Sequence, residues 1–304
     1  FLEAGGEEYH FIPCLNDRPE QIDLLTDLVR RNLGGWVTAM ARDSWEVTAT
    51  YATHAPDEPG VAWHHLDVRD PAAVSTLIAE LHPHVIIHAA ALNPGQGNDF
   101  EGVNVTGTHN VARAAAAIGA RLLHISTDVL FDGCKGGYVE PDPPAPLTAY
   151  ARAKAAAEHE VVESGVDAVI VRTSLIYGWR PTVARAAQWM IDAAVSGETI
   201  SLWSDEMRCP IWVESLAGAL VELADMDYTG FLHVAGGQIV SRYEFGLALL
   251  QFHGIDTSNV LPATSPPNAM RPLDCSLDCS LARSLLATPL PGVDEVLARG
   301  DAIR

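Results

Sequence analysis

Residues 122–133 read LLHISTDVLFDG, and after a Pro-rich loop the chain continues as TAYARAKAAAE at 148–158. The first segment is an apolar, β-like run that ends in Ser-Thr-Asp at 126–128, so two hydroxyls and a carboxylate lie where a strand opens into a loop. The second segment is Ala-rich with strong helix propensity, which places Tyr150 and Lys154 on one helix face, one turn apart. A strand end and a helix turn therefore offer polar groups that can act together.

This combination suits the transfer of a proton to a carbonyl oxygen. A phenol has an unperturbed pKa of about 10, and an ammonium one helical turn away favours its ionised form. A hydroxyl at the adjacent strand end can orient the reacting oxygen. The sequence thus predicts a catalytic set in which Tyr150 is the acid, Lys154 lowers the pKa of Tyr150, and a hydroxyl of the Ser-Thr-Asp run orients the carbonyl.

Several segments carry a resemblance to a known family. They are ISTDVLFDG at 125–133, YVEPDPPAPLTAYARAK at 138–154, VRTSLIYG at 171–178, RCPIWVESLA at 208–217 and MRPLDCSLD at 270–278. The chain resembles the extended short-chain dehydrogenase/reductase superfamily and, within it, the dTDP-4-dehydrorhamnose reductase group. The five segments occur along this chain in the same order as their counterparts in that group. The resemblance implies an α/β fold, a Rossmann-type doubly wound parallel sheet with a smaller C-terminal substrate lobe.

The expected organisation has two parts. Residues 1–178 would form the dinucleotide-binding domain and residues 179–304 mainly the substrate lobe, with about 208–235 returning to the sheet. Alternation and β-branched runs predict strands at 45–51, 61–66, 84–90, 166–174 and 230–235. Helices are predicted at 71–81, 100–118, 182–196 and from 213, and a further one is capped by Ser241 and stopped at Gly254; Asp70 is the expected N-cap of the helix at 71–81.

The first βα turn, within residues 1–35, is atypical. The resembled family has a TGxxGxxG turn there, in which backbone N–H groups approach the cofactor pyrophosphate. This chain reads LLTDLVRRNLGG at 24–35, where Gly34 stands for the last glycine and the first two are missing. Alternatively, residues 10–15 are the first strand and residues 20–32 a helix.

The resemblance implies further site residues. Cofactor contacts are expected from Gly34, Asp67, Ala89, Ala90, Ser126, Tyr150, Lys154 and Thr173. The resemblance also assigns the orienting hydroxyl to Thr127, and Asn104 is expected to join the catalytic set by holding a helix carbonyl and a water near the lysine.

The choice between NAD and NADP is open. NAD-specific sites carry an acidic residue after the second strand, whereas this chain has Thr50, Tyr51 and Thr53 there. We favour NADP because no acidic group would repel its 2′-phosphate.

Substrate contacts are expected from Asp128, Arg208 and Arg271, with the arginines directed to a diphosphate. Val129 follows Asp128 where the reductases usually show Tyr, and the 4,6-dehydratase branch would show Glu. The absence of Glu at position 129 disfavours 4,6-dehydratase activity.

Composition narrows the class of protein. Nineteen basic and 39 acidic residues give a net charge of −20 without a Lys/Arg cluster, which disfavours nucleic-acid and anionic-membrane partners. The five cysteines lack paired zinc-ligand spacing, so neither a disulfide framework nor a structural metal is expected. Since no run of about 18 apolar residues is present, we expect a cytoplasmic protein that does not span a membrane. The sequence leaves open whether it forms a homodimer.

Three functions compete. The first is an NAD(P)H-dependent reductase of a 4-keto-6-deoxy nucleotide sugar, as the resemblance implies. The second is a non-catalytic regulatory subunit similar to the methionine adenosyltransferase β subunit, favoured by the altered glycine turn. The third is a nucleotide-sugar epimerase, which would keep its cofactor permanently bound.

Overall fold

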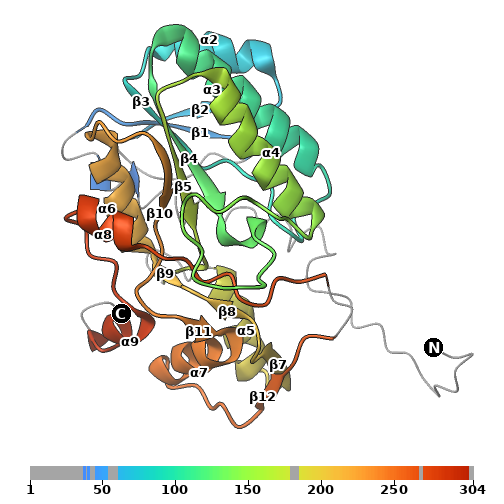
Figure 1. Ribbon diagram of the computed structural model, residues 1–304. Helices are drawn as coiled ribbons and strands as arrows, with labels where there is room; N and C mark the ends of the chain where they lie inside the picture. Colours follow the sequence, from blue (N-terminus) through green and yellow to red (C-terminus); the bar gives the residue numbers. More distant parts are fainter. Residues whose placement is uncertain are drawn as a thin grey trace, which may run out of the picture.

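A four-stranded parallel sheet lies at the centre of the chain (Figure 1). The computed structural model describes residues 37–38, 40–41, 45–53, 61–178, 185–266 and 270–300. The strand order is β10-β5-β4-β3, with bounds Gly230–His233 (β10), Ala168–Thr173 (β5), Arg121–Thr127 (β4) and Val85–His88 (β3). All three pairings are parallel, which confirms the α/β reading. The strands are shorter than predicted, and β3 ends at His88 rather than at residue 90.

Helices cover both faces of this sheet. Figure 1 shows three of them on one face, namely α2 (Pro71–Leu81), α3 (Gly107–Ile118) and α4 (Ala149–Ser164). The opposite face carries α6 (Val213–Ala224) and α8 (Ser280–Leu285). Along β4, Leu122 joins the core under α2, α3 and α4, while its neighbour Leu123 joins the core under α6. Because successive strand residues point to opposite faces, a sheet covered on both sides needs a continuous apolar run.

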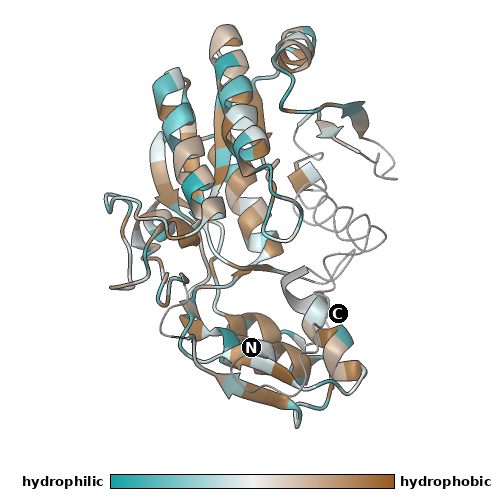
Figure 2. Ribbon diagram, turned by 90° about the vertical axis from the view of Figure 1, so that its right-hand side faces the viewer, coloured by the Kyte–Doolittle hydropathy of each residue, from teal (hydrophilic) through white to brown (hydrophobic). Residues whose placement is uncertain are grey.

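A second, smaller core lies in the C-terminal lobe. It is built on the parallel pair β7 (Ile200–Trp203) and β12 (Val260–Ala263), packed against α5 (Arg185–Val195), α7 (Arg242–Phe252) and α9 (Val293–Leu297). Its interior includes Tyr177, Trp212 and Phe245, whose rings meet edge to face. Figure 2 shows this lobe below the sheet, with hydrophobic segments in its helices and strands.

Short strands connect and flank these two units. Residues Met207–Arg208 (β8) pair with Val240–Ser241 (β11), and Ile176–Tyr177 (β6) pair with Ile211–Trp212 (β9). Near the N-terminal end of the described chain, Thr48–Tyr51 (β1) and Ala62–His65 (β2) form a separate parallel pair. Within the described ranges no helix has the length and apolar character to cross a bilayer, and no group of three His, Cys, Asp or Glu is placed to hold a metal ion.

Local capping fixes where two helices begin. Asp70 caps α2 by accepting from the N–H groups of Ala72 and Ala73, as predicted. Ser241 caps α7 in a reciprocal capping box with Glu244, also as predicted. These contacts span two or three residues, so the sequence alone specifies them.

The helix predicted over residues 100–118 is divided. Its first part, Glu101–Thr106 (η3), is a π-helix, and α3 follows from Gly107. A Cβ added at Gly107 would lie 2.6 Å from the Val68 side chain, so only glycine allows this close approach without a shift. Wider turns of this type are frequent at functional sites.

Candidate active site

The carboxyl ends of β3, β4 and β5 form the rim on which the predicted residues gather. Thr127 ends β4 directly opposite Thr173, the last residue of β5. Ala89 and Ala90 follow β3 and are exposed. Because parallel strands present their carboxyl ends at one edge of the sheet, residues far apart in the sequence meet here.

Tyr150 lies in the first turn of α4, next to Thr127. Thr148 fixes the start of that helix, since its hydroxyl accepts from the N–H of Ala151 at 3.1 Å. The Tyr150 ring is half-buried and meets Phe100 edge to face, with ring centres 5.9 Å apart. The structure thus brings together the predicted hydroxyl and the predicted phenol.

The pKa of Tyr150 differs from the sequence-based expectation. Burial and the Asp128 carboxylate raise it to about 12, and a hydrogen bond with Thr127 opposes this increase. The prediction that Tyr150 has a lowered pKa is therefore wrong for the structure described here, because desolvation of the phenolate has the largest effect on that pKa. Tyr150 is held as a protonated phenol, the form that a proton donor requires.

Lys154 is buried beneath the same rim. Its ammonium donates to the carbonyl of Ile125 at 2.7 Å and lies 3.4 Å from Nε2 of His124. Burial lowers the pKa of Lys154 to about 8, and the nearby charge of Glu158 partly opposes that decrease. The amine therefore titrates closer to neutrality than an exposed lysine.

Asn104 is buried in the π-helix and binds the segment that follows β3. Its side chain accepts from the N–H of Leu92 at 2.6 Å and donates to the carbonyl of the same residue at 3.0 Å. The structure gives Asn104 these partners in place of the helix carbonyl expected from the sequence. Its own backbone carbonyl accepts from Thr108, whose hydroxyl also contacts His88.

Two buried hydroxyls at the rim indicate where a polar ligand group fits. Ser126 and Thr173 are each 4% exposed. Neither hydroxyl has a hydrogen-bond partner among the described residues. Buried hydroxyls are normally paired, and a carboxamide such as that of nicotinamide supplies both donors and acceptors. With Lys154 beside them, these residues fit the nicotinamide end of a dinucleotide.

Two predicted cofactor contacts remain, Gly34 and Asp67. Gly34, with the turn at 24–35, is outside the described residues. Asp67 follows β2 and forms an exposed ion pair with Arg69 at 2.7 Å, which lowers its pKa. Its contact with an adenine stays a prediction.

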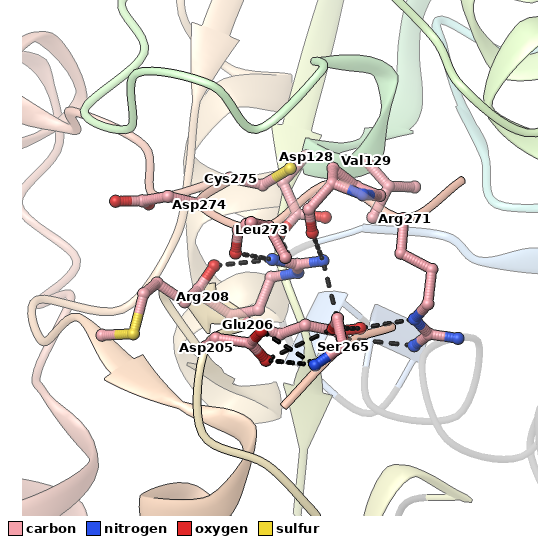
Figure 3. Close-up of polar contacts among 12 residues, drawn as sticks. Asp128, Val129, Asp205, Glu206, Arg208, Ser265, Arg271, Leu273, Asp274 and Cys275 are labelled. Carbon is pink, nitrogen blue, oxygen red and sulfur yellow. Dashed lines mark hydrogen bonds and ion pairs between the residues drawn. The ribbon is translucent and has the colours of Figure 1, made fainter. Parts of the chain in front are cut away.

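A network of charged side chains joins the rim to the C-terminal lobe (Figure 3). Asp128 is buried, accepts from Ser174 at 2.5 Å and faces the Arg208 guanidinium at 3.8 Å. Arg208 is 4% exposed and donates to the carbonyls of Pro272 and Leu273, both at 3.0 Å. Burial raises the pKa of Asp128, and the charge of Arg208 opposes that effect.

Arg271 is placed differently from Arg208. Its side chain is 48% exposed and pairs with the carboxylate of Glu206, which is 1% exposed, as Figure 3 shows. It also lies over the ring of Trp203, at 5.7 Å. Arg271 thus presents part of its guanidinium to solvent, while Arg208 is committed to internal contacts.

Sequence reasoning missed four residues of this region. They are His88, His124, Ser174 and Glu206. His124 stands two residues before the Ser-Thr-Asp run, so a polar residue inside an apolar strand was the available signal. No local pattern points to Glu206, whose partner Arg271 is far away in the sequence.

The fold and the site together define a class. A Rossmann-type sheet with Thr127 at its carboxyl rim, next to a helix that carries Tyr150 and Lys154, is the arrangement of the extended short-chain dehydrogenase/reductase type. The model of the RmlD substrate binding domain family matches residues 33–300. The chain belongs to this family.

Relatives of two kinds are similar to this chain. The chain is 35% identical over 230 residues to dTDP-4-dehydrorhamnose reductase of Mycobacterium tuberculosis, covering 72% of this chain and 75% of that protein. It is 31% identical over 237 residues to methionine adenosyltransferase 2 subunit beta of Rattus norvegicus, covering 73% and 71%.

A solved structure is of the first kind. The dTDP-4-dehydrorhamnose reductase of Bacillus anthracis in complex with NADP is similar with a TM-score of 0.73 and 28% identity, covering 84% of this chain and 97% of that one.

Proposed function

We propose that this chain is an NAD(P)H-dependent reductase that converts the C4 ketone of a 4-keto-6-deoxy nucleotide sugar to an alcohol. One observation supports the proposal most directly: the Tyr150 phenol lies close enough to the Thr127 hydroxyl, at the carboxyl end of β4, for that hydroxyl to affect its pKa, and Lys154 lies one turn further along α4. A hydroxyl, a phenol and an amine at that position are the groups that protonation of a carbonyl needs.

Thr127, Tyr150 and Lys154 have separate roles in the proposed reduction. The substrate carbonyl oxygen accepts hydrogen bonds from Thr127 and Tyr150, which polarise it. The phenol proton of Tyr150 passes to this oxygen, so that an alcohol and a tyrosinate result. Lys154 stabilises the tyrosinate by its charge and would hold the ribose next to the nicotinamide. A bound nicotinamide dinucleotide supplies the hydride that C4 receives.

We propose NADP as the preferred cofactor. The end of β1 carries Tyr51, which meets His65 edge to face at 5.6 Å, and no acidic residue occupies this end of the strand. The Bacillus anthracis reductase, which is in complex with NADP, is consistent with this choice. Ser126 and Thr173 would hold the nicotinamide carboxamide, and Ala89 and Ala90 would allow close passage of the cofactor.

The substrate contacts follow from the charged network. Arg271 is the residue best placed to bind a diphosphate, since part of its guanidinium is exposed and its position is held by Glu206. Asp128 and Arg208 would shape the sugar end of the site from beneath. This assignment gives Arg208 a supporting part, which differs from the direct contact expected from the sequence.

A second function is favoured by a different observation. Similarity to methionine adenosyltransferase 2 subunit beta covers as much of the chain as similarity to the reductases. Val129 stands where the resembled reductases usually show Tyr, which also weakens the assignment of a sugar. Under this alternative the chain would be a regulatory subunit without turnover.

Calorimetric titration with NADPH and with NADH separates the two functions. The reductase proposal predicts binding of at least one cofactor, with NADPH the tighter. Ser126→Val should weaken that binding, whereas Ser196→Val, in an exposed turn after α5, should not. Binding of neither cofactor would contradict the reductase and favour the regulatory subunit.

A further inference from the structure

His124 is a buried histidine in contact with the lysine of the proposed site. Its Nε2 lies 3.4 Å from the Lys154 ammonium, which also donates to the Ile125 carbonyl at 2.7 Å. Both contacts come from consecutive residues of β4, so a single strand holds the amine. An ammonium has three N–H donors, and these two contacts leave one for other partners.

The contact determines where the proton of His124 lies. Lys154 is charged below its pKa of about 8, so Nε2 acts as acceptor and the ring proton is on Nδ1. Nδ1 is buried and has no hydrogen-bond partner among the residues described in the structure. Burial and the charge of Lys154 hold the pKa of His124 well below its ordinary value, which keeps the ring a neutral acceptor.

A second histidine packs against this ring. His88 stands opposite His124 in the β3–β4 pairing, with ring centres 5.5 Å apart and planes tilted by 31°. The Thr108 hydroxyl donates to the Asn104 carbonyl at 2.7 Å, so it accepts from Nε2 of His88 at 3.1 Å. The pKa of His88 is lowered to about 3, chiefly by burial. His88 therefore packs against His124 as a neutral ring.

We infer that His124 is a positioning residue for Lys154: it accepts a hydrogen bond from the ammonium and, with the Ile125 carbonyl, directs the remaining N–H toward the reaction. The effect on turnover rests on the proposed reductase function, whereas the effect on Lys154 does not.

Two other polar side chains, Glu158 and Tyr150, are one turn from Lys154 on the same helix, α4. Glu158, one turn along α4, attracts the ammonium but is itself held by Arg172 of β5 in an ion pair of 2.8 Å. Tyr150 lies one turn before Lys154 on the same helix.

The pair H124N and H124Q tests this inference. A glutamine side chain extends as far as Nε2 of histidine and keeps an acceptor near the ammonium, whereas asparagine ends near the position of Nδ1. An acceptor favours the charged amine, so we expect H124N to lower the pKa of Lys154 by about one unit, a roughly tenfold rise in its acid dissociation constant. H124Q should keep the wild-type value.

The sequence makes this measurement simple. The chain contains two lysines, Lys135 and Lys154, so protein labelled with ¹³C-lysine gives two side-chain signals to titrate. Lys135 is 52% exposed and serves as the internal control. A folded H124N in which Lys154 titrates as in the wild type would overturn the inference.

Two further readouts complete the test. In the reductase assay, H124N should lower kcat by about tenfold with unchanged KM for the sugar nucleotide, and H124Q should restore it. If the wild type has no turnover, the proposed function fails while the lysine titration still decides the role of His124. Should H124N not fold, ¹⁵N shifts of His124 in the wild type replace it: the Nδ1–H tautomer is expected, and the Nε2–H tautomer would overturn the inference.

Discussion

Glu158 on α4 and Arg172 on β5 form an ion pair beneath the candidate active site, with side chains 3% and 2% exposed. The guanidinium donates to the carboxylate through Nη2 at 2.8 Å and Nε at 3.0 Å, and it lies 4.4 Å from the ring centre of Phe231. This pair joins the helix that carries Tyr150 and Lys154 to the sheet.

Removal of either side chain of the Glu158–Arg172 pair should lower the free energy of unfolding substantially. Arg172→Met leaves the Glu158 carboxylate buried without its cation, so we expect the free energy of unfolding to fall by about 3–5 kcal/mol. Urea titration followed by circular dichroism measures this change. Arg69→Met is the control, because it breaks a pair whose side chains are 51% and 40% exposed and should cost at most about 1 kcal/mol. Equal losses in the two variants would show that the buried pair is not a structural link.

The pKa of Lys154 has a consequence for stability. Burial lowers this pKa to about 8 from an ordinary 10.5. Between these pH values the unfolded chain binds more protons than the folded chain, so stability must rise with pH and level off above 10.5. Below pH 8 both states are protonated and the cost of burying the charge is fully present.

Comparison with Lys154→Met isolates this contribution. The difference in free energy of unfolding between wild type and variant should shift in favour of the wild type by roughly 2–4 kcal/mol as the pH rises from about 8 to 10.5. Urea unfolding at a series of pH values measures it. A difference that does not change with pH would contradict the lowered pKa.

The two arginines of the charged network should respond differently to truncation. Arg271→Ala removes a half-exposed guanidinium, but Glu206 keeps Arg208 as a second cation at 4.0 Å. We therefore expect KM for the sugar nucleotide to rise by about tenfold with a modest loss of stability. Arg208→Ala leaves Asp128 buried without its cation and two carbonyls without their donor, so it should destabilise the fold by about 3–5 kcal/mol. Steady-state kinetics and urea unfolding of both variants test this contrast. Loss of substrate affinity in a fully stable Arg208→Ala protein would return Arg208 to direct contact with substrate.

Local sequence was sufficient for part of this fold. The caps at Asp70 and Ser241 were predictable because their partners lie within three residues. The proximity of Thr127 to Tyr150 was predictable from a strand end followed by a helix start. The strand bounds were less certain, since only pairing with neighbours decides where a strand such as β3 ends.

Non-local contacts account for what the sequence did not reveal. Whether His88 meets His124 depends on the register of two parallel strands, and nothing in either strand states that register. Arg208 and Arg271 look alike as bare charges, yet one is buried among carbonyls and the other half-exposed. The raised pKa of Tyr150 likewise follows from burial, which spacing along a helix cannot show.

The most direct test of the central claim is the loss of NADPH absorbance when the protein is mixed with a dTDP-4-keto-6-deoxy sugar, for wild type and for Tyr150→Phe. We expect the wild type to consume NADPH in proportion to the sugar, and the variant, with the same circular dichroism spectrum and NADPH affinity, to lose activity by a factor of about 10²–10⁴ because it lacks the proton donor. Unchanged consumption by Tyr150→Phe would contradict the account.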